Sequence, residues 1–526
     1  MKKLELRDYQ QECVNTLNHL DGGSHLVAVA TGLGKTVIFS QLERKGRVLI
    51  LSHRDELVHQ PQKYYDCSFG VEQAEEKSHG EEVVSASVQS IVRRLDKFSP
   101  DDFDMIITDE AHHAAAKSYR KIYDYFKPRL HIGFTATPNR GDKVRLDDVF
   151  EDIIFQRDLR WGIKNGYLTD INCLQADIGY DLTKVRKKLG DFEVKELAQA
   201  INQEKMNKGI AEAYRQLAVG QTIIFAANVA HATAIANEIE GAVVVSAQTK
   251  NRAEIIEKFT NREIPCIVNC MVFTEGTDIP LIETIIIARP TANESLYTQM
   301  VGRGLRLYQG KKFLTLIDCV GVTGKNEICT APSLLGIDMS EIPPKNRSKV
   351  TGMLSQMEYT VQKLLDTPEA WIINTREINL FAEESHLDLH NVNWKKRYDG
   401  SLICGLKGQE QIRLTSMNEL GRTDVLYCKG QNYAPVILAE NIPIQEAFDR
   451  TYTYLQNHYA NLQQFWDMER VNVWGKNPAS PAQKNLIRKL LNKRENIRKY
   501  HCPDYDVSHL NKYEASIIID RLLSNA

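Results

Sequence analysis

The chain has 526 residues, of which 43% are hydrophobic and 25% are charged, and its formal net charge is −2. These values are ordinary for a globular protein of about three or four domains, and they exclude a globally basic chain, so any nucleic-acid-binding surface must be local. The N-terminal residues MKKLELRDYQQ lack the apolar core of a signal peptide, and no apolar run approaches the roughly 20 residues that span a bilayer. We therefore expect a cytoplasmic protein without membrane contact.

Ten cysteines are scattered along the chain, and none of them forms a C-x-x-C pair. Cys266 and Cys270 lie in an apolar segment typical of a buried strand, and Cys404 and Cys428 have no partners at the spacing of zinc ligands. We therefore predict reduced structural cysteines in a cytosolic protein, and no zinc site.

Short apolar runs alternate with amphipathic stretches from the N-terminus to about residue 335. This alternation is typical of parallel sheets covered by helices on both faces. The first set of strand-like runs spans residues 25–30, 47–52, 82–87, 104–110 and 130–137. A second set of similar size spans residues 221–227, 242–247, 265–270, 283–289 and 313–318. The pattern predicts two tandem α/β domains at residues 1–160 and 161–340, with an irregular connection near residues 155–195.

The pattern changes after the Pro- and Lys-rich segment IPPKNRSK at residues 342–349. Short β-like runs follow, and the YDGS sequence at residues 398–401 suits a hairpin turn. From about Pro443 the chain has a helical pattern. We expect an α+β accessory domain at residues 341–445 and a basic helical domain at residues 446–526.

The segment TGLGKT follows a predicted strand and precedes a helix-capable stretch, which is the context of a phosphate-binding P-loop. Its two glycines let the backbone approach a phosphate without a Cβ in the way, and successive N–H groups then face the anion. Lys35 is expected to reach the β- and γ-phosphates, and the Thr36 hydroxyl is expected to hold Mg²⁺. The loop that we expect to bind the nucleotide consists of Thr31, Gly32, Leu33, Gly34, Lys35 and Thr36.

A second predicted strand ends in the acidic pair Asp109 and Glu110. In a parallel sheet this position places both carboxylates at the edge that also carries the P-loop. We expect Asp109 to hold the metal and Glu110 to orient and deprotonate the attacking water. The two motifs together predict a Mg²⁺-dependent hydrolase of nucleoside triphosphates.

Residues 109–112, DEAH, resemble the motif that names the DEAH-box helicases of superfamily 2, and the other motifs of that superfamily appear in its order. Before the DEAH motif, RDYQ at residues 7–10 resembles the Q motif, HRDEL at 53–57 resembles motif Ia, and SASVQS at 85–90 resembles motif Ib. After it, TATP at residues 135–138 resembles motif III, FTEGTDIP at 273–280 resembles motif V, and QMVGRGLR at 299–306 resembles motif VI. Superfamily 2 motors commonly lack the first glycine of the P-loop pattern, and Val29 takes its place here.

The resemblance implies two RecA-like P-loop domains that close on ATP and shift along nucleic acid with each hydrolysis cycle, with ATP and Mg²⁺ as cofactors. Arg303 and Arg306 lie three residues apart on a predicted helix, where a shared face lets both stabilise charge on the γ-phosphate. The further residues that the resemblance implies in nucleotide contact are Arg7, Gln10, Gly276 and Asp278. The residues that it implies in coupling hydrolysis to movement are His112, Thr135, Thr137 and Gln299, and those in strand contact are Arg54 and Gln89.

Smaller differences between these motifs and those of other superfamily 2 helicases indicate which nucleic acid the protein binds. The DEAH and TAT sequences differ from the usual motifs of DEAD-box RNA helicases, and residues 190–217 and 223–237 resemble RadD-type bacterial DNA helicases and the branch-migrating mitochondrial helicases of yeast. RadD proteins carry a C-terminal zinc-binding cysteine cluster, which this chain lacks. The resemblance implies single-stranded, duplex or branched DNA as the track, replication or repair proteins as partners, and a place at the nucleoid of a bacterial or phage-type cytosol.

The C-terminal segment between Lys476 and Lys499 is rich in lysine and arginine, and Glu495 is its one acidic residue. A basic helix in a neutral protein is a candidate phosphate-binding face, although a solvated helix face gives the same pattern. The candidate DNA contacts on it are Lys484, Arg488 and Arg494. Two other functions stay open: an RNA helicase, and a DNA-translocating subunit of a restriction or defence complex whose nuclease is a partner chain.

Overall fold

The computed structural model describes residues 5–53, 55–136, 146–188, 190–270, 279, 281–322, 328–335, 337, 342, 350–357, 361, 368, 371–372, 387–396, 400–407, 410–418, 420–430, 433–493, 496–497, 500 and 502–524. The chain divides into one compact unit of residues 1–337 and 351–357 and a second unit of residues 338–350 and 358–526. Among the described residues, no helix is long and apolar enough to cross a membrane, and no cluster of His, Cys, Asp and Glu has the arrangement of a metal site.

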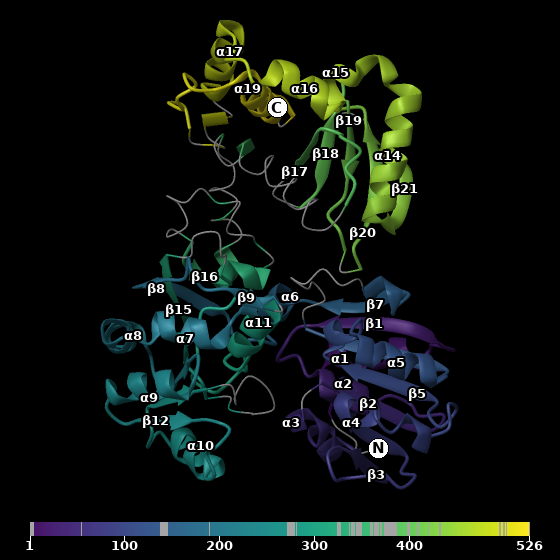
Figure 1. Cartoon of the computed structure of the whole chain (residues 1–526), viewed down its shortest axis with the longest axis vertical. Coiled ribbons are helices and arrows are strands. Elements are labelled where there is room, and N and C mark those ends of the chain that lie inside the picture. The colour runs from purple at the N-terminus through teal and green to yellow at the C-terminus, as the bar shows by residue number, and fades with distance from the viewer. Residues whose placement is uncertain are drawn as a thin grey trace. The chain divides into compact units, whose positions relative to one another are not determined.

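The first unit contains a seven-stranded parallel sheet in the order β3-β4-β2-β5-β6-β1-β7 (Figure 1). Its strands are Gly23–Val29 (β1), Val48–Ser52 (β2), Phe69–Glu72 (β3), Val83–Ser87 (β4), Met105–Asp109 (β5), Leu130–Thr135 (β6) and Asp152–Arg157 (β7). The helices are Asp8–Asn18 (α1), Lys35–Ser40 (α2), Asp55–Val58 (α3), Val88–Ile91 (α4) and Lys117–Tyr125 (α5). Every residue of β2, β4, β5 and β6 is buried, as expected where both faces of a parallel sheet are covered.

The same unit contains a second seven-stranded sheet, in the order β12-β13-β11-β14-β15-β8-β16. Its strands are Ile171–Asp181 (β8), Thr222–Phe225 (β11), Ala242–Val245 (β12), Cys266–Asn269 (β13), Thr284–Ile287 (β14), Leu314–Val322 (β15) and Gly352–Met353 (β16). The helices are Val194–Ile201 (α7), Glu204–Leu217 (α8), Val229–Asn237 (α9), Arg252–Thr260 (α10) and Glu294–Gly302 (α11). All pairs in this sheet are parallel except β16 with β8. The predicted pair of α/β sheets is confirmed.

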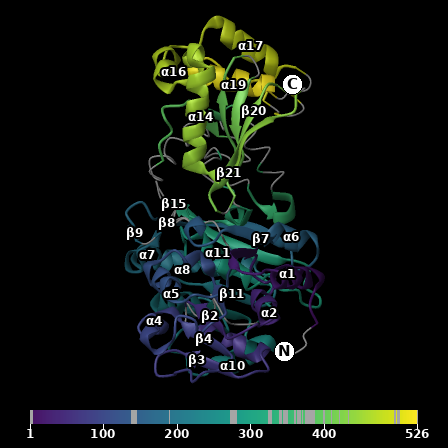
Figure 2. The same cartoon turned by 90° about the vertical axis from the view of Figure 1, so that its right-hand side faces the viewer.

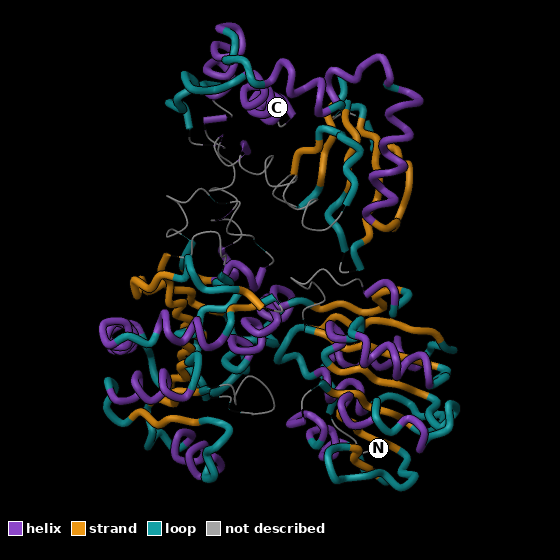
Figure 3. Tube along the Cα trace, viewed as in Figure 1, coloured by secondary structure: helices purple, strands orange, loops and turns teal. Residues whose placement is uncertain are grey.

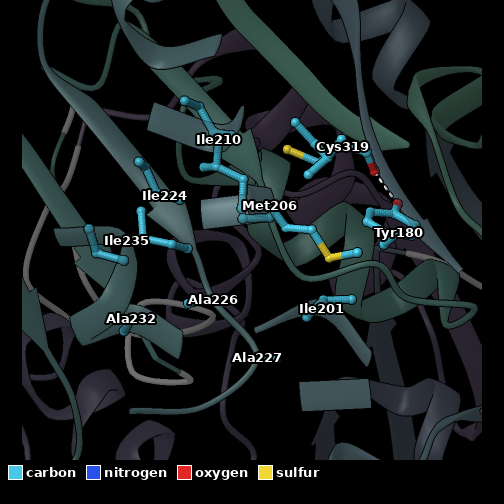
Figure 4. Close-up of a cluster of buried hydrophobic side chains, with 14 of the residues drawn as sticks. Tyr180, Ile201, Met206, Ile210, Ile224, Ala226, Ala227, Ala232, Ile235 and Cys319 are labelled. Carbon is cyan, nitrogen blue, oxygen red and sulfur yellow. Dashed lines mark hydrogen bonds between the residues drawn. The ribbon is translucent and has the colours of Figure 1, made fainter. Parts of the chain in front are cut away.

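The core of the second sheet lies where α8 packs against the strands. Figure 4 shows Met206 and Ile210 of α8 among buried side chains such as Ile224, and the Tyr180 hydroxyl of β8 donates to the carbonyl of Cys319 in β15. This hydrogen bond joins the two strands that extend the sheet toward its β16 edge. The sheet is therefore fixed on that side by a buried polar contact as well as by its ladder.

The segment near residues 155–195 is not irregular, contrary to our expectation. It contains the end of β7, the helix α6 (Leu159–Lys164), the whole of β8, and a small hairpin of β9 (Lys187–Lys188) and β10 (Asp191–Phe192). The strand β8 alternates between buried and more exposed residues over much of its length. Its sequence INCLQADIGYD therefore has no continuous apolar run, which is the signal that identified the central strands.

The second unit contains a five-stranded antiparallel sheet in the order β17-β18-β19-β20-β21, followed by helices (Figures 2 and 3). Its strands are Trp394–Lys396 (β17), Leu402–Gly405 (β18), Gln411–Leu414 (β19), Arg422–Cys428 (β20) and Val436–Pro443 (β21). The helices are Ile444–His458 (α14), Gln463–Trp466 (α15), Met468–Gly475 (α16), Pro481–Leu491 (α17) and Lys512–Ser524 (α19). The antiparallel pairing of β17 with β18 confirms the hairpin predicted around YDGS. The bounds of the four proposed domains stay predictions.

Trp466 is central to the core of this sheet. Its side chain is fully buried, and its indole N–H donates to the carbonyl of Tyr459 at 2.9 Å. Replacing it by alanine is expected to lower the stability of the sheet by about 3–5 kcal/mol, because a large cavity remains. Hydrogen exchange of β18 and β19 amides in the full chain measures this loss. Trp474→Ala is the matched control, since Trp474 is only partly buried; equal effects of the two substitutions would contradict the assignment.

Candidate nucleotide site

The P-loop follows β1 and leads directly into α2. Gly32 and Gly34 have φ angles of +84° and +81°, which lie in the left-handed region that side chains other than glycine rarely adopt. A Cβ on Gly34 would lie 2.6 Å from Nε2 of Gln10, so a larger residue would also displace the Gln10 side chain. The loop backbone is therefore curved and open in the way that close approach of a phosphate requires.

The Q-motif segment at the start of α1 holds this loop from one side. The Tyr9 hydroxyl donates to the carbonyl of Leu33 at 2.7 Å, and the side-chain amide of Gln10 donates to the same carbonyl at 3.0 Å. The side-chain oxygen of Gln10 accepts from the backbone N–H of Arg7 at 3.0 Å. Gln10 therefore lies at the loop. Tyr9 was missed by the sequence analysis, although it adjoins Gln10 in the RDYQ motif.

The acidic pair lies at the same edge of the sheet, because β5 is separated from β1 only by β6. Asp109 is the last residue of β5 and is buried, and Glu110 follows with a left-handed φ of +49°. The ammonium of Lys35 lies 3.6 Å from Oε1 of Glu110. The structure therefore brings together the P-loop lysine and the two carboxylates that the sequence analysis selected.

The two carboxylates differ in their affinity for a proton. Burial raises the pKa of Asp109 to about 7, and the adjacent charge of Glu110 adds to this shift while Lys35 opposes it. Burial acts in the same direction on Glu110, but the charge of Lys35 and the hydrogen bond from His112 outweigh it and hold the pKa of Glu110 well below its usual range. Glu110 therefore stays ionised at neutral pH, as a proton acceptor must be.

His112 links the acidic pair to two other elements. Its Nδ1 lies 3.3 Å from Oε2 of Glu110 and 3.4 Å from the hydroxyl of Thr135 at the end of β6. Its Nε2 lies 3.1 Å from the hydroxyl of Ser295, which belongs to α11 of the second sheet. The sequence motifs include His112 and Thr135 but not Ser295, which lies just before the motif VI residues.

The helix α11 ends close to the P-loop. A Cβ on Gly302 would lie 2.1 Å from Cγ2 of Thr31, so the backbone of α11 packs directly against the Thr31 side chain here. Gln299 is buried on this helix. The expectation that Arg303 and Arg306 share a helical face is wrong, because α11 ends at Gly302. Arg303 is the C-cap residue, and Arg306 lies in the following turn, where its carbonyl accepts from the hydroxyl of Thr169 at 3.1 Å.

The remaining predicted residues are dispersed. Gln89 is exposed on α4, and its side-chain amide donates to the carbonyl of His53 at 3.0 Å. In the second unit, Lys484 and Arg488 lie on α17, where Lys484 donates to the carbonyl of Ser508 at 2.7 Å. Thr36 lies in the first turn of α2. Five predicted site residues lie outside the described part of the chain: Arg54, Thr137, Gly276, Asp278 and Arg494.

A phosphate loop after β1, an acidic pair after β5 and a second α/β sheet that contacts both define a P-loop ATPase with two RecA-like domains. Residues 3–140 match the family model described as type III restriction enzyme, res subunit, and residues 204–308 match the model described as helicase conserved C-terminal domain. Over these two ranges the chain is similar to superfamily 2 helicases, and the ranges correspond to the two halves of a helicase motor core.

Three relatives illustrate this similarity. A Saccharomyces cerevisiae protein named as the ATP-dependent helicase IRC3 is 32% identical over 437 residues, a match that covers 72% of this chain and 62% of that protein. A Schizosaccharomyces pombe protein named as a mitochondrial ATP-dependent helicase is 28% identical over 537 residues, covering 92% and 87%. The DNA 3'-5' translocase XPB2 of Sulfurisphaera tokodaii is 26% identical over 355 residues, covering 58% and 79%. The chain thus spans less than two thirds of the first relative.

Proposed function

We propose that the protein is an ATP-dependent DNA helicase or translocase that couples hydrolysis to movement on duplex or branched DNA in replication, recombination or repair. The observation that carries this proposal is the meeting of Lys35, Glu110 and α11 at one edge of the first sheet. Groups from both RecA-like domains converge there, so the chemistry at the nucleotide depends on how the domains are arranged.

The residues at this edge fit ATP with Mg²⁺. The glycine curvature of the P-loop offers backbone N–H groups to an anion, and Lys35 supplies a positive charge beside them. The hydroxyl of Thr36 and the carboxylate of Asp109 would hold the metal, which when bound neutralises charge on the phosphates. Gln10 and Arg7 would contact the adenine, and Gly276 and Asp278 would contact the ribose and γ-phosphate side.

The chain's own groups then have separate tasks. Glu110 is ionised and would take a proton from the attacking water, while Lys35 would balance charge on the phosphates. Arg303 and Arg306 would bring guanidinium groups from the second domain. We assign the coupling of hydrolysis to movement to His112, Thr135, Thr137 and Gln299. His112 supports this assignment most directly, because it contacts both domains.

The raised pKa of Asp109 leads to a prediction about metal binding. Below pH 7 this carboxyl holds a proton in the metal-free protein, and Mg²⁺ must displace it, so metal affinity should fall as the pH falls. Addition of Mg²⁺ to the nucleotide-loaded protein at about pH 6.5 is expected to release about one proton. Calorimetry in two buffers of different ionisation enthalpy measures this number. Asp109→Asn should release clearly less, and equal release would contradict Asp109 as the ligand.

Several observations support DNA as the track. The family model over residues 3–140 is named for restriction enzymes, whose substrate is DNA, and one relative is named as a DNA translocase. We propose Arg54 and Gln89 in the first unit, and Lys484, Arg488 and Arg494 in the second, as strand contacts. The side chains of Gln89 and Arg488 are exposed, which supports this proposal, because a side chain that contacts the DNA backbone must be able to reach a phosphate.

The test is ATPase activity of the full chain with single-stranded DNA, duplex DNA, forks, Holliday junctions and RNA at one stated salt concentration. We expect stimulation by at least one DNA structure and much less by RNA. Stimulation by RNA alone would make the protein an RNA helicase. Stimulation by duplex alone, with a nuclease recovered as a stable partner, would favour the motor of a restriction or defence complex, the second candidate that the restriction-enzyme model suggests.

Buried cysteines that remain thiols, such as Cys173, Cys266 and Cys404, support a reducing compartment. We propose the cytosol and nucleoid of a bacterial or phage-type system, with replication or repair proteins as further partners. The name of the fission-yeast relative makes the mitochondrion the alternative compartment. Fractionation of the native host separates the two.

A further inference from the structure

Ser295 is the residue of α11 that contacts the DEAH motif, and none of the sequence motifs includes it. Its hydroxyl lies 3.1 Å from Nε2 of His112. Ser295 stands in the first turn of α11, where the N-cap residue Asn293 accepts from the N–H of Leu296 and fixes the start of the helix. The hydroxyl is therefore presented by a rigid, capped helix end.

Both ring nitrogens of His112 have polar neighbours. Nδ1 faces Glu110 and Thr135, Nε2 faces Ser295, and the ring of His113 lies 4.2 Å away between centroids. A carboxylate can only accept, so a proton on Nδ1 is the arrangement that suits its 3.3 Å approach to Oε2 of Glu110. In the neutral imidazole Nε2 is then an acceptor, and the Ser295 hydroxyl donates to it. The contact with Ser295 therefore favours the tautomer in which Nδ1, on the side of Glu110, carries the proton.

A single short helix touches both nucleotide motifs of the first domain. Ser295 at its start meets the DEAH motif, and Gly302 at its end meets Thr31 of the P-loop. Seven residues of helix span about 10 Å, so the two contacts are made or lost together as the helix moves. Of the two, only the Ser295 contact is made to a side chain that also lies against Glu110, since Nδ1 of His112 is 3.3 Å from Oε2.

We propose that Ser295 is a positioning residue that makes the orientation of Glu110 depend on docking of the second RecA-like domain, by holding His112 at Nε2. The inference rests on the proposed ATPase function and deepens it. When α11 is docked, His112 fixes the carboxylate of Glu110 for proton transfer. When α11 withdraws, His112 loses its Nε2 partner and its hold on Glu110 loosens, which slows hydrolysis in the open protein.

The experiment measures steady-state ATPase of the full chain with saturating nucleic acid for wild type, Ser295→Ala, Ser295→Thr, His112→Ala and the double variant Ser295→Ala/His112→Ala. Loss of one neutral hydrogen bond should lower kcat about three- to tenfold in Ser295→Ala and leave KM for ATP within about twofold. Ser295→Thr keeps the hydroxyl and should restore most of the activity. The double variant should be no slower than His112→Ala alone, because both changes interrupt one chain of contacts.

Thr260→Ala, which removes an exposed hydroxyl at the end of α10, is the matched control and should behave as wild type. A wild-type kcat in Ser295→Ala, or independent effects that multiply in the double variant, would overturn the inference. If Ser295→Ala fails to fold in a thermal melt, Ser295→Cys gives the same test with a weaker donor of similar size. An inactive wild type would refute the proposed function instead, so the two failures are distinguishable.

Discussion

Replacing Lys35 by alanine is expected to lower kcat/KM for ATP by about 10²- to 10³-fold, the usual loss when one preorganised charge donor is removed from a reacting centre. The structure gives two reasons for a large effect. The ammonium is the positive charge beside the P-loop, and it lies 3.6 Å from Glu110, whose pKa it helps to hold low. Loss of the Lys35 ammonium therefore weakens phosphate binding and also removes a charge that keeps Glu110 ionised.

The measurement is a coupled ATPase assay with saturating DNA, together with a thermal melt to show that the variant folds. Lys45→Ala, at an exposed lysine of the same domain, is the matched control and should retain full activity. Full activity in Lys35→Ala would remove the basis for an ATP site at this loop.

Replacing Glu110 by glutamine is expected to separate binding from hydrolysis. The amide has nearly the same shape but cannot accept the proton of the attacking water, so kcat should fall by about 10²- to 10⁴-fold. Lys35 and the P-loop are unchanged, so the dissociation constant for ATP should stay within about threefold. A fluorescent ATP analogue measures binding, and single-turnover hydrolysis measures the chemical step.

Glu43→Gln, at an exposed carboxylate of the same domain, controls for the change of charge and should hydrolyse ATP normally. If Glu110→Gln hydrolysed ATP as fast as the wild type, Glu110 would not be the base. A loss of binding without a loss of the chemical step would instead give Glu110 a purely structural role beside Lys35.

The central strands could be predicted from the sequence because they are buried on both faces. Runs such as VLIL in β2 are apolar throughout, and most of the predicted runs lie inside the sheets, although the predicted β12 lies at an edge. Edge strands carry less of this signal. The short β3 and the strand β7 lie at the two edges of the first sheet, β7 is only partly buried, and β8 alternates in burial, so none of them was predicted.

The nucleotide site could be predicted as far as its residues follow strands. The P-loop that carries Lys35 follows β1, and Glu110 comes directly after β5, so strand position placed both correctly. Ser295 and Tyr9 could not be found in this way, because their roles depend on contacts between segments distant in the chain. The helical pairing of Arg303 and Arg306 failed because α11 ends at Gly302, before the motif is complete.

Movement along DNA is the central claim. The most direct measurement is the ATPase rate of the full chain with DNA molecules of increasing length, at a constant total concentration of DNA nucleotides. A motor hydrolyses more ATP on a longer track, since it takes more steps before it dissociates. We predict a rate that rises with length to a plateau and falls to background in Glu110→Gln. A rate that is the same with long DNA, short DNA and no DNA would contradict the account.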